Sequence, residues 1–130
     1  MLIGGPSRTG ESKLSIVRIA RIAAWCLALA IIVLSVVPAG LRPETAAPHD
    51  VEHFGIFFAA GLAFAIGYDH RHSLMAILFV LYSAAIETVQ LFVPGRHARL
   101  SDFIVDALAM CAGLFVVILV GRSLRFRAQP

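Results

Sequence analysis

The sequence predicts an all-α integral membrane protein, a bundle of four transmembrane helices. The composition is 59% hydrophobic and only 15% charged, whereas a soluble domain is nearer half apolar and about a quarter charged. Four apolar stretches follow one another, each close to the roughly 20 residues that a helix needs to cross a bilayer. The basic residues gather near the two ends of the chain. Helices are favoured because an isolated strand leaves its backbone polar groups unsatisfied in lipid.

The predicted spans are separated by residues that break helices. Pro38 follows the first span, charged residues follow the second, and Pro94 and Gly95 follow the third. The four spans are 19–37, 51–68, 74–93 and 103–120. The chain then divides into a basic tail, a helical domain and a second basic tail, at residues 1–18, 19–120 and 121–130.

The distribution of Lys and Arg predicts that both termini are cytoplasmic. This orientation leaves eight basic residues inside and three outside, out of 11, as the positive-inside rule requires. A nucleic-acid partner is not expected, because that function needs a basic face with base-stacking aromatic residues. An alternative makes the first apolar segment a cleaved signal peptide ending near Val37-Pro38-Ala39. Three remaining helices would bury the polar groups less well than four.

Small residues recur every four positions in two of the spans. They are Gly55, Ala59, Ala63 and Gly67 in the second, and Ala109 and Gly113 in the fourth. This spacing lets helix backbones approach closely in lipid. We therefore expect both stripes to lie at helix contacts in a compact bundle.

Glu87 is the residue that most needs an explanation. It lies inside the otherwise apolar third span, where a carboxylate costs about 2.5–3.5 kcal/mol. Gln90 follows three positions later and so shares its helix face. A partner in the bundle, a water-filled pocket or a function must offset the cost.

Polar residues from three predicted helix ends and one loop should meet at a single level of the membrane. With both termini inside, that level is the outer one, and inverting the topology would move all the residues together. The set is Asp50, Glu52 and His53, then Glu87 and Gln90, then Arg96, His97 and Arg99, then Ser101, Asp102 and Asp106.

The needs of the fold explain part of this convergence. Ser101 or Asp102 would suit the N-cap of the fourth helix, and a carboxylate in its first turn is favoured by the helix dipole. An arginine of the third loop would pair with one of the acids. A purely structural role for these polar residues is therefore one interpretation. Against it, there are more polar residues than helix capping and one ion pair require.

Three motifs follow one another along the chain. They are Asp50-x-x-His53-Phe54, Glu87-Thr88-x-Gln90-x-Phe92-x-Pro94-Gly95-Arg96 and Ser101-Asp102-x-x-x-Asp106. In this order they resemble the VanZ-like family of membrane proteins. The resemblance covers residues 19–120 and departs from the family at Val51, where lysine is common, at Asp106, where asparagine is usual, and at Ala109, where glycine is common. It implies a multi-pass protein of the bacterial cytoplasmic (inner) membrane with a cell-envelope role, and it implies no particular reaction.

Two classes of function fit these residues. The first is binding of an anionic membrane lipid or lipid-linked saccharide by Gln90, Arg96 and Arg99 in an outward-facing polar pocket, because guanidinium groups suit phosphate and carboxylate. The second is an enzyme acting on such a lipid, for which the catalytic candidates are His53, Glu87, Asp102 and Asp106. Whether the protein is an enzyme stays open at this stage.

Two other functions would use only part of this set of polar residues. A structural or accessory subunit would use it only to hold helices together, in a homo- or hetero-oligomer. A proton-coupled carrier using Glu87 would also have to oligomerise, since four spans contain no broken-helix repeat.

Neither a metal nor a cofactor is expected. One histidine among scattered carboxylates is a weak pattern beside the H-E-x-x-H metal motif. Cys26 and Cys111 both fall in apolar spans without a spacing that favours zinc or a disulfide framework. We expect them to be small buried hydrophobic residues.

Overall fold

The computed structural model describes residues 8–38, 49–68, 71–95 and 99–127, and these residues form four helices with no strand among them. The predicted all-α architecture is therefore confirmed. The helices are α1 (Arg8–Val36), α2 (His49–Gly67), α3 (His72–Gln90) and α4 (Leu100–Arg127).

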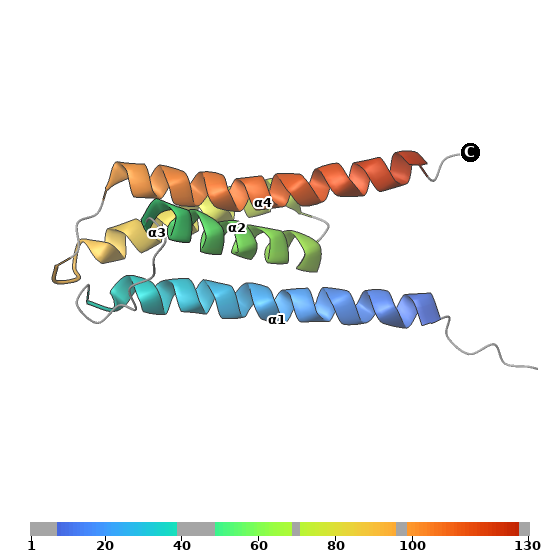
Figure 1. The fold of residues 1–130 in the computed structure, drawn as a ribbon, viewed down its shortest axis with the longest axis horizontal. Helices are drawn as coiled ribbons and strands as arrows, with labels where there is room; N and C mark the ends of the chain where they lie inside the picture. Colours follow the sequence, from blue (N-terminus) through green and yellow to red (C-terminus); the bar gives the residue numbers. More distant parts are fainter. Residues whose placement is uncertain (1–7, 39–48, 69–70, 96–98, 128–130) are drawn as a thin grey trace, which may run out of the picture.

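The first and last helices are longer than the predicted spans. α1 begins at Arg8 rather than at residue 19, and α4 continues to Arg127. Figure 1 shows both helices extending past α2 and α3 at the end of the bundle where the chain begins and ends. Arg and Lys are good helix formers, so a helix need not stop where its apolar stretch does. Basic residues assigned to the tails thus lie on helices.

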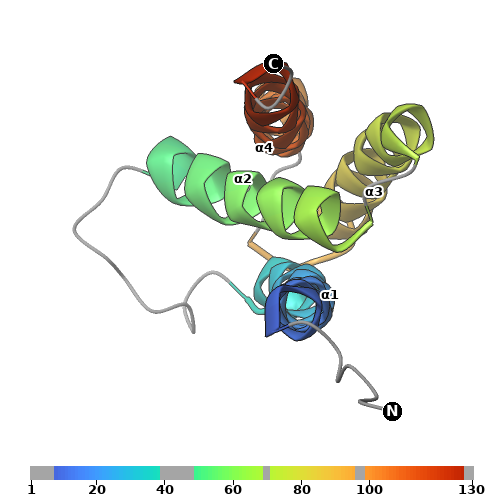
Figure 2. The same cartoon turned by 90° about the vertical axis from the view of Figure 1, so that its right-hand side faces the viewer.

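Three helices contain segments long and apolar enough to cross a membrane, namely Gly10–Val36, His72–Gln90 and Leu100–Arg125. The apolar part of α2, Val51–Gly67, is shorter. α2 lies in the middle of the bundle, between α1 and α4 (Figure 2). Its polar first turn can therefore face protein, which is where polar groups at membrane depth are tolerated.

Small side chains face inward on α1, and large apolar ones face outward. Ala20, Ala24 and Ala28 are buried, whereas Ile22 and Leu29 are exposed. Because lipid tails are as apolar as leucine, helix association in a membrane depends on close packing rather than on burying large apolar groups. α2 makes the most extensive contacts, first with α4 and then with α1.

Two glycines allow α2 and α4 to cross at short range. A Cβ atom on Gly61 would overlap the carbonyl oxygen of Met110, and one on Gly113 would lie 2.5 Å from the carbonyl oxygen of Phe58. Ala109 is fully buried in the same region. The stripe predicted on the fourth helix, Ala109 and Gly113, is confirmed.

The stripe predicted on the second helix is wrong in its register. A Cβ on Gly55 would meet nothing, and Ala59 and Ala63 are only half-buried. Of the four predicted positions, Gly67 alone is tightly packed, with a Cβ there 2.9 Å from Cγ of Arg21. The reason is that α2 packs against partners on two sides, so a single four-residue period cannot describe its contacts. The fully buried small residues are Ala60 and Ala65.

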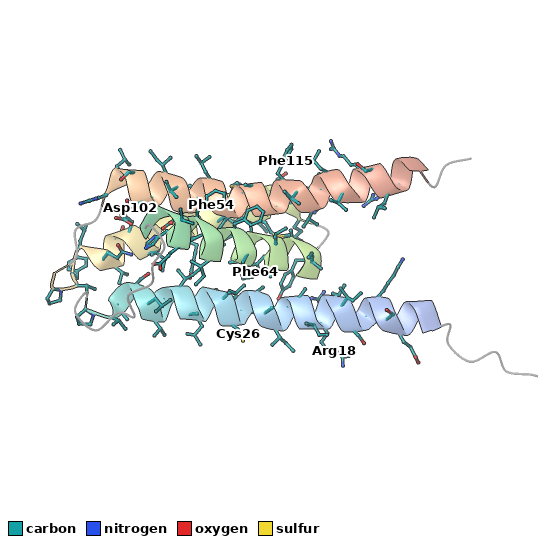
Figure 3. All side chains as sticks on the ribbon, viewed as in Figure 1. Arg18, Cys26, Phe54, Phe64, Asp102 and Phe115 are labelled. Atoms are coloured by element: carbon teal, nitrogen blue, oxygen red, sulfur yellow. The ribbon has the colours of Figure 1, made fainter. Side chains whose placement is uncertain are left out.

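The expectation that both cysteines are buried is also wrong. Cys26 is exposed on the outer face of α1 (Figure 3), and Cys111 is half-buried. Both are free thiols. A small apolar thiol faces lipid at little cost, so position within a span does not imply burial in the bundle.

The α2–α4 crossing predicts a matched pair of glycine variants. Gly61→Ala should lower the free energy of unfolding by about 1–3 kcal/mol, the usual cost of overpacking, because the new methyl group meets backbone rather than a movable side chain. Gly55→Ala, on the same helix with open space around it, should leave stability unchanged. Equilibrium unfolding in mixed detergent micelles measures both. Equal stabilities for the two variants would contradict the crossing.

Candidate functional site

Glu87 and Gln90 lie on the buried face of α3, as their spacing predicted. The other buried residues of this helix recur at the same three- and four-residue intervals. Only 8% of the Glu87 surface and 3% of the Gln90 surface are exposed. The acid in the third span is therefore held inside the bundle.

Glu87 is bonded to the start of α4. Its Oε1 accepts a hydrogen bond of 2.5 Å from the backbone N–H of Arg99. The carbonyl of Arg99 in turn accepts from the amides of Asp102 (3.0 Å) and Phe103 (3.2 Å). Amides at the beginning of a helix lack partners within the helix, and the helix dipole favours negative charge there. A carboxylate from α3 thus anchors the N-terminus of α4.

This arrangement corrects two expectations about the start of the fourth helix. Ser101 and Asp102 lie inside the first turn rather than at the N-cap, because α4 begins at Leu100. Ser101 Oγ donates instead to the Asp102 carboxylate at 3.0 Å. Arg99 meets Glu87 through its backbone, and no acid in the described part of the chain pairs with its guanidinium. The predicted pairing of an arginine side chain with one of the acids is therefore not made by Arg99, and the other candidate, Arg96, lies outside the described residues.

A tight turn brings the chain back to Glu87. After α3, the amides of Leu91, Phe92 and Val93 bond to carbonyls three residues earlier. Gly95 follows with a φ of 78°, a conformation that glycine adopts without a Cβ penalty. The third helix therefore ends at Gln90 rather than at Val93, and the tighter turn begins the reversal towards α4. Arg96 and His97 lie outside the described residues.

His53 and Asp106 form a buried pair across the α2–α4 contact. Nδ1 of His53 lies 3.2 Å from Oδ1 of Asp106, and their residue surfaces are 7% and 0% exposed. An ionised carboxylate only accepts hydrogen bonds, so Nδ1 of His53 then carries the proton. The His53 ring also stacks on Phe57 with centroids 6.1 Å apart. Helix packing therefore places an imidazole beside a carboxylate.

Part of the predicted convergence of polar residues is present among the described residues. Glu87 interacts electrostatically with His53, Asp102 and Asp106, which come from α2 and α4. These groups lie at the end of the bundle opposite the termini, where Figure 3 labels Asp102. We call the set the polar cluster: His53, Glu87, Gln90, Arg99, Asp102 and Asp106. Arg96 and the side chain of Asp50 fall outside the described residues.

Glu87 and Gln90 each have one buried side-chain atom without a hydrogen-bond partner in the described part of the chain. These atoms are Oε2 of Glu87, an acceptor, and Nε2 of Gln90, a donor. One helical turn separates the two residues. Buried polar groups without partners are rare, and each is costly. A donor and an acceptor therefore remain for a ligand or for water. No described group of three or more His, Cys, Asp or Glu side chains is placed to hold a metal ion.

Comparison with protein families matches residues 19–121 to VanZ/LLP1. The chain belongs to this family. No curated protein matches it, and no solved structure does. In this VanZ/LLP1 protein the matched region contains the whole polar cluster. Asp106, where the resemblance leads one to expect asparagine, is the partner of His53, and an amide oxygen would accept the same hydrogen bond.

Two polar contacts that α1 makes with other helices of this VanZ/LLP1 protein were not evident from the sequence. Tyr82 Oη donates to the carbonyl of Ala28 at 2.6 Å and ties α3 to α1. Arg21 Nε donates to the carbonyl of Gly67 at 2.8 Å and ties α1 to α2. The sequence feature that could have indicated these contacts is Arg21, a charged residue near the beginning of the first apolar span. It lies four residues before the single Trp of the chain.

The His53–Asp106 pair predicts a strong and specific effect on stability. Asp106→Ala should lower the free energy of unfolding by about 3 kcal/mol, because it leaves a buried imidazole without its carboxylate. Asp106→Asn should retain most of the stability, since its amide oxygen still accepts from His53. Asp102→Ala is the matched control, one turn earlier on α4 and less buried, and should cost no more than about 1 kcal/mol. Equal losses for the two alanine variants, measured by SDS titration, would contradict the pair.

Proposed function

We propose that this protein binds the polar head of an anionic lipid, or of a lipid-linked envelope molecule, at the polar cluster. It would do so in the bacterial cytoplasmic membrane, with both termini inside and the polar cluster outward. The observation that carries the proposal is a pair of buried atoms on α3, Glu87 Oε2 and Gln90 Nε2, for which the described residues provide no hydrogen-bond partner. A head group with hydroxyl and phosphate oxygens offers a donor to the first and an acceptor to the second.

The surroundings of these two atoms support an anionic ligand. The Arg99 side chain is exposed beside them, and a guanidinium binds phosphate or carboxylate through a planar fork of donors. The start of α4 adds the positive end of a helix dipole. The lipid tails would lie against the apolar outer faces of the helices, which expose residues such as Leu91 and Leu108.

Native mass spectrometry of protein released from nanodiscs tests this proposal. The wild type should carry a lipid of defined mass. Gln90→Leu, which removes the amide but keeps the volume and an apolar character, should reduce the retained fraction about tenfold. Arg99→Gln, which keeps the backbone N–H that Glu87 needs, should do the same.

Thr88→Val is the matched control. Thr88 lies between Glu87 and Gln90 in sequence, but its side chain is exposed and its Oγ1 donates to the carbonyl of Ala84 within the same helix. The retained lipid should therefore be unchanged in this variant. Lipid that survives in both Gln90→Leu and Arg99→Gln, or that is lost equally in Thr88→Val, contradicts binding at the polar cluster.

The His53–Asp106 pair favours a second candidate, an enzyme acting on the same lipid. A histidine whose Nδ1 is bonded to a carboxylate is oriented as a general base is in many hydrolases. In that case the wild type should convert the bound lipid to a species of lower mass. His53→Gln should then retain the lipid unconverted. A bound lipid of constant mass in the wild type contradicts this candidate and leaves the binding proposal standing.

A further inference from the structure

A second site is present at the opposite end of the bundle. A cleft of about 730 Å³ opens between α1, α2 and α3, within the roughly 300–1,000 Å³ typical of small-molecule pockets. It is lined by the middle of α1, the end of α2 and the first half of α3, with Met110 of α4. In Figure 2 the start of α3 stands well apart from α1. None of the residues of the polar cluster lines this cleft.

The charged residues that the structure describes at the mouth of the cleft are both cationic. They are Arg21 and Arg71, and no acid lines the cleft among the described residues. Arg21 is held in place, because its Nε donates to the carbonyl of Gly67 at 2.8 Å and its guanidinium lies 4.9 Å from the centre of the Tyr68 ring. The two Nη groups of Arg21 have no acceptor in the described part of the chain. A guanidinium fixed in this way presents its remaining donors to an anion.

An aromatic pair adds a further donor beside Arg21. Nε1 of Trp25 donates to the hydroxyl oxygen of Tyr68 at 3.0 Å. The hydroxyl proton of Tyr68 has no acceptor among the described residues and remains to be donated. Trp and Tyr concentrate at the boundary between lipid tails and head groups. The mouth therefore presents hydrogen-bond donors that have no acceptor among the described residues. It does so at the level of the lipid head groups.

The body of the cleft is apolar. Phe64 lies between α2 and α1 (Figure 3) and stacks edge-on against Trp25, with centroids 5.5 Å apart. Met75, Leu78 and Phe79 form the α3 side. A free phosphate would leave this volume empty, whereas a lipid tail would fill it. The chemistry of the whole cleft, donors above and hydrocarbon below, matches one molecule with both parts.

We propose that this cleft is a specific site for an anionic phospholipid, whose phosphate is held by Arg21, Arg71 and Tyr68 and one of whose acyl chains occupies the space between α1 and α3. Basic pockets between membrane helices on the cytoplasmic side bind such head groups in general. The site does not depend on the polar cluster, which lies at the other end of the bundle, so each can fail without the other.

Trp25 makes the test direct, because it is the single Trp of the chain and lines the cleft. The protein is reconstituted in phosphatidylcholine bilayers that contain increasing fractions of a lipid with brominated acyl chains. Bromine quenches the fluorescence of a Trp that it contacts. Brominated phosphatidylglycerol should quench Trp25 at a several-fold lower fraction than brominated phosphatidylcholine does. Arg71→Gln should reduce this preference about fivefold, the usual contribution of one arginine near a membrane surface.

Two variants keep the test independent of folding. Arg71 makes no side-chain hydrogen bond to a described residue, so Arg71→Gln should fold normally even if Arg21→Gln loosens α1 from α2. Arg18→Gln is the matched control, since Arg18 is exposed, points away from the bundle in Figure 3 and does not line the cleft. The preference for phosphatidylglycerol should be unchanged in Arg18→Gln.

Four outcomes would overturn the proposal. The first is equal quenching by the two brominated lipids in the wild type. The second is an undiminished preference in Arg71→Gln, and the third is an equal loss in Arg18→Gln, which would indicate only diffuse surface charge. The fourth is fluorescence recovery on adding soluble glycerol phosphate, which would indicate a site for free anions. A Trp25 that neither lipid quenches is a case of the first outcome and would indicate that a second copy of the chain covers the cleft.

Discussion

The close crossing of α2 and α4 is the contact on which the rest of the structure depends. At Gly61 and Gly113 the backbones approach without intervening side chains, which is how helices gain packing energy in lipid. One consequence is geometric: His53, two turns before Gly61, reaches Asp106 on the partner helix. Another is that α2 becomes the central helix, so that α1 and α4 lie on opposite sides of it. The polar groups near the start of α2 are thereby removed from lipid.

The two ends of the bundle differ in chemistry. At the end opposite the termini, buried acids are bonded to backbone or to a histidine, as Glu87 is to Arg99 and Asp106 to His53. At the end with the termini, the polar groups are arginines and aromatic residues at the mouth of an apolar cleft. Among the described residues, the first end has an acceptor and a donor without partners, at Glu87 and Gln90, and the second has donors without acceptors, at Arg21 and Tyr68. A difference of this kind suits a protein that meets different head groups at its two ends.

The sequence predicted the helical class, the approximate spans and the gathering of polar residues, because each depends on hydropathy and on helical spacing. Glu87 and Gln90 were placed on one buried face because three residues nearly complete a helical turn. The packing register of α2 was not predictable, since a helix with partners on two sides has no single stripe of small residues. The bond between Glu87 and the Arg99 backbone was also hidden, because residue types report side chains and not the amides that a turn exposes. The cleft between α1 and α3 depends on helix tilt, which no local pattern encodes.

A double-mutant cycle on His53 and Asp106 tests the central claim most directly, namely that the α2–α4 crossing joins these side chains inside the membrane. The free energies of unfolding of the wild type, His53→Ala, Asp106→Ala and the double variant would be measured in mixed detergent micelles. The structure predicts a coupling energy of at least about 1 kcal/mol, within the range found for polar pairs between membrane helices. If the losses of unfolding free energy in the two single variants add up to that of the double variant, the coupling energy is near zero. That result would show that the two side chains do not meet, and it would contradict the α2–α4 crossing.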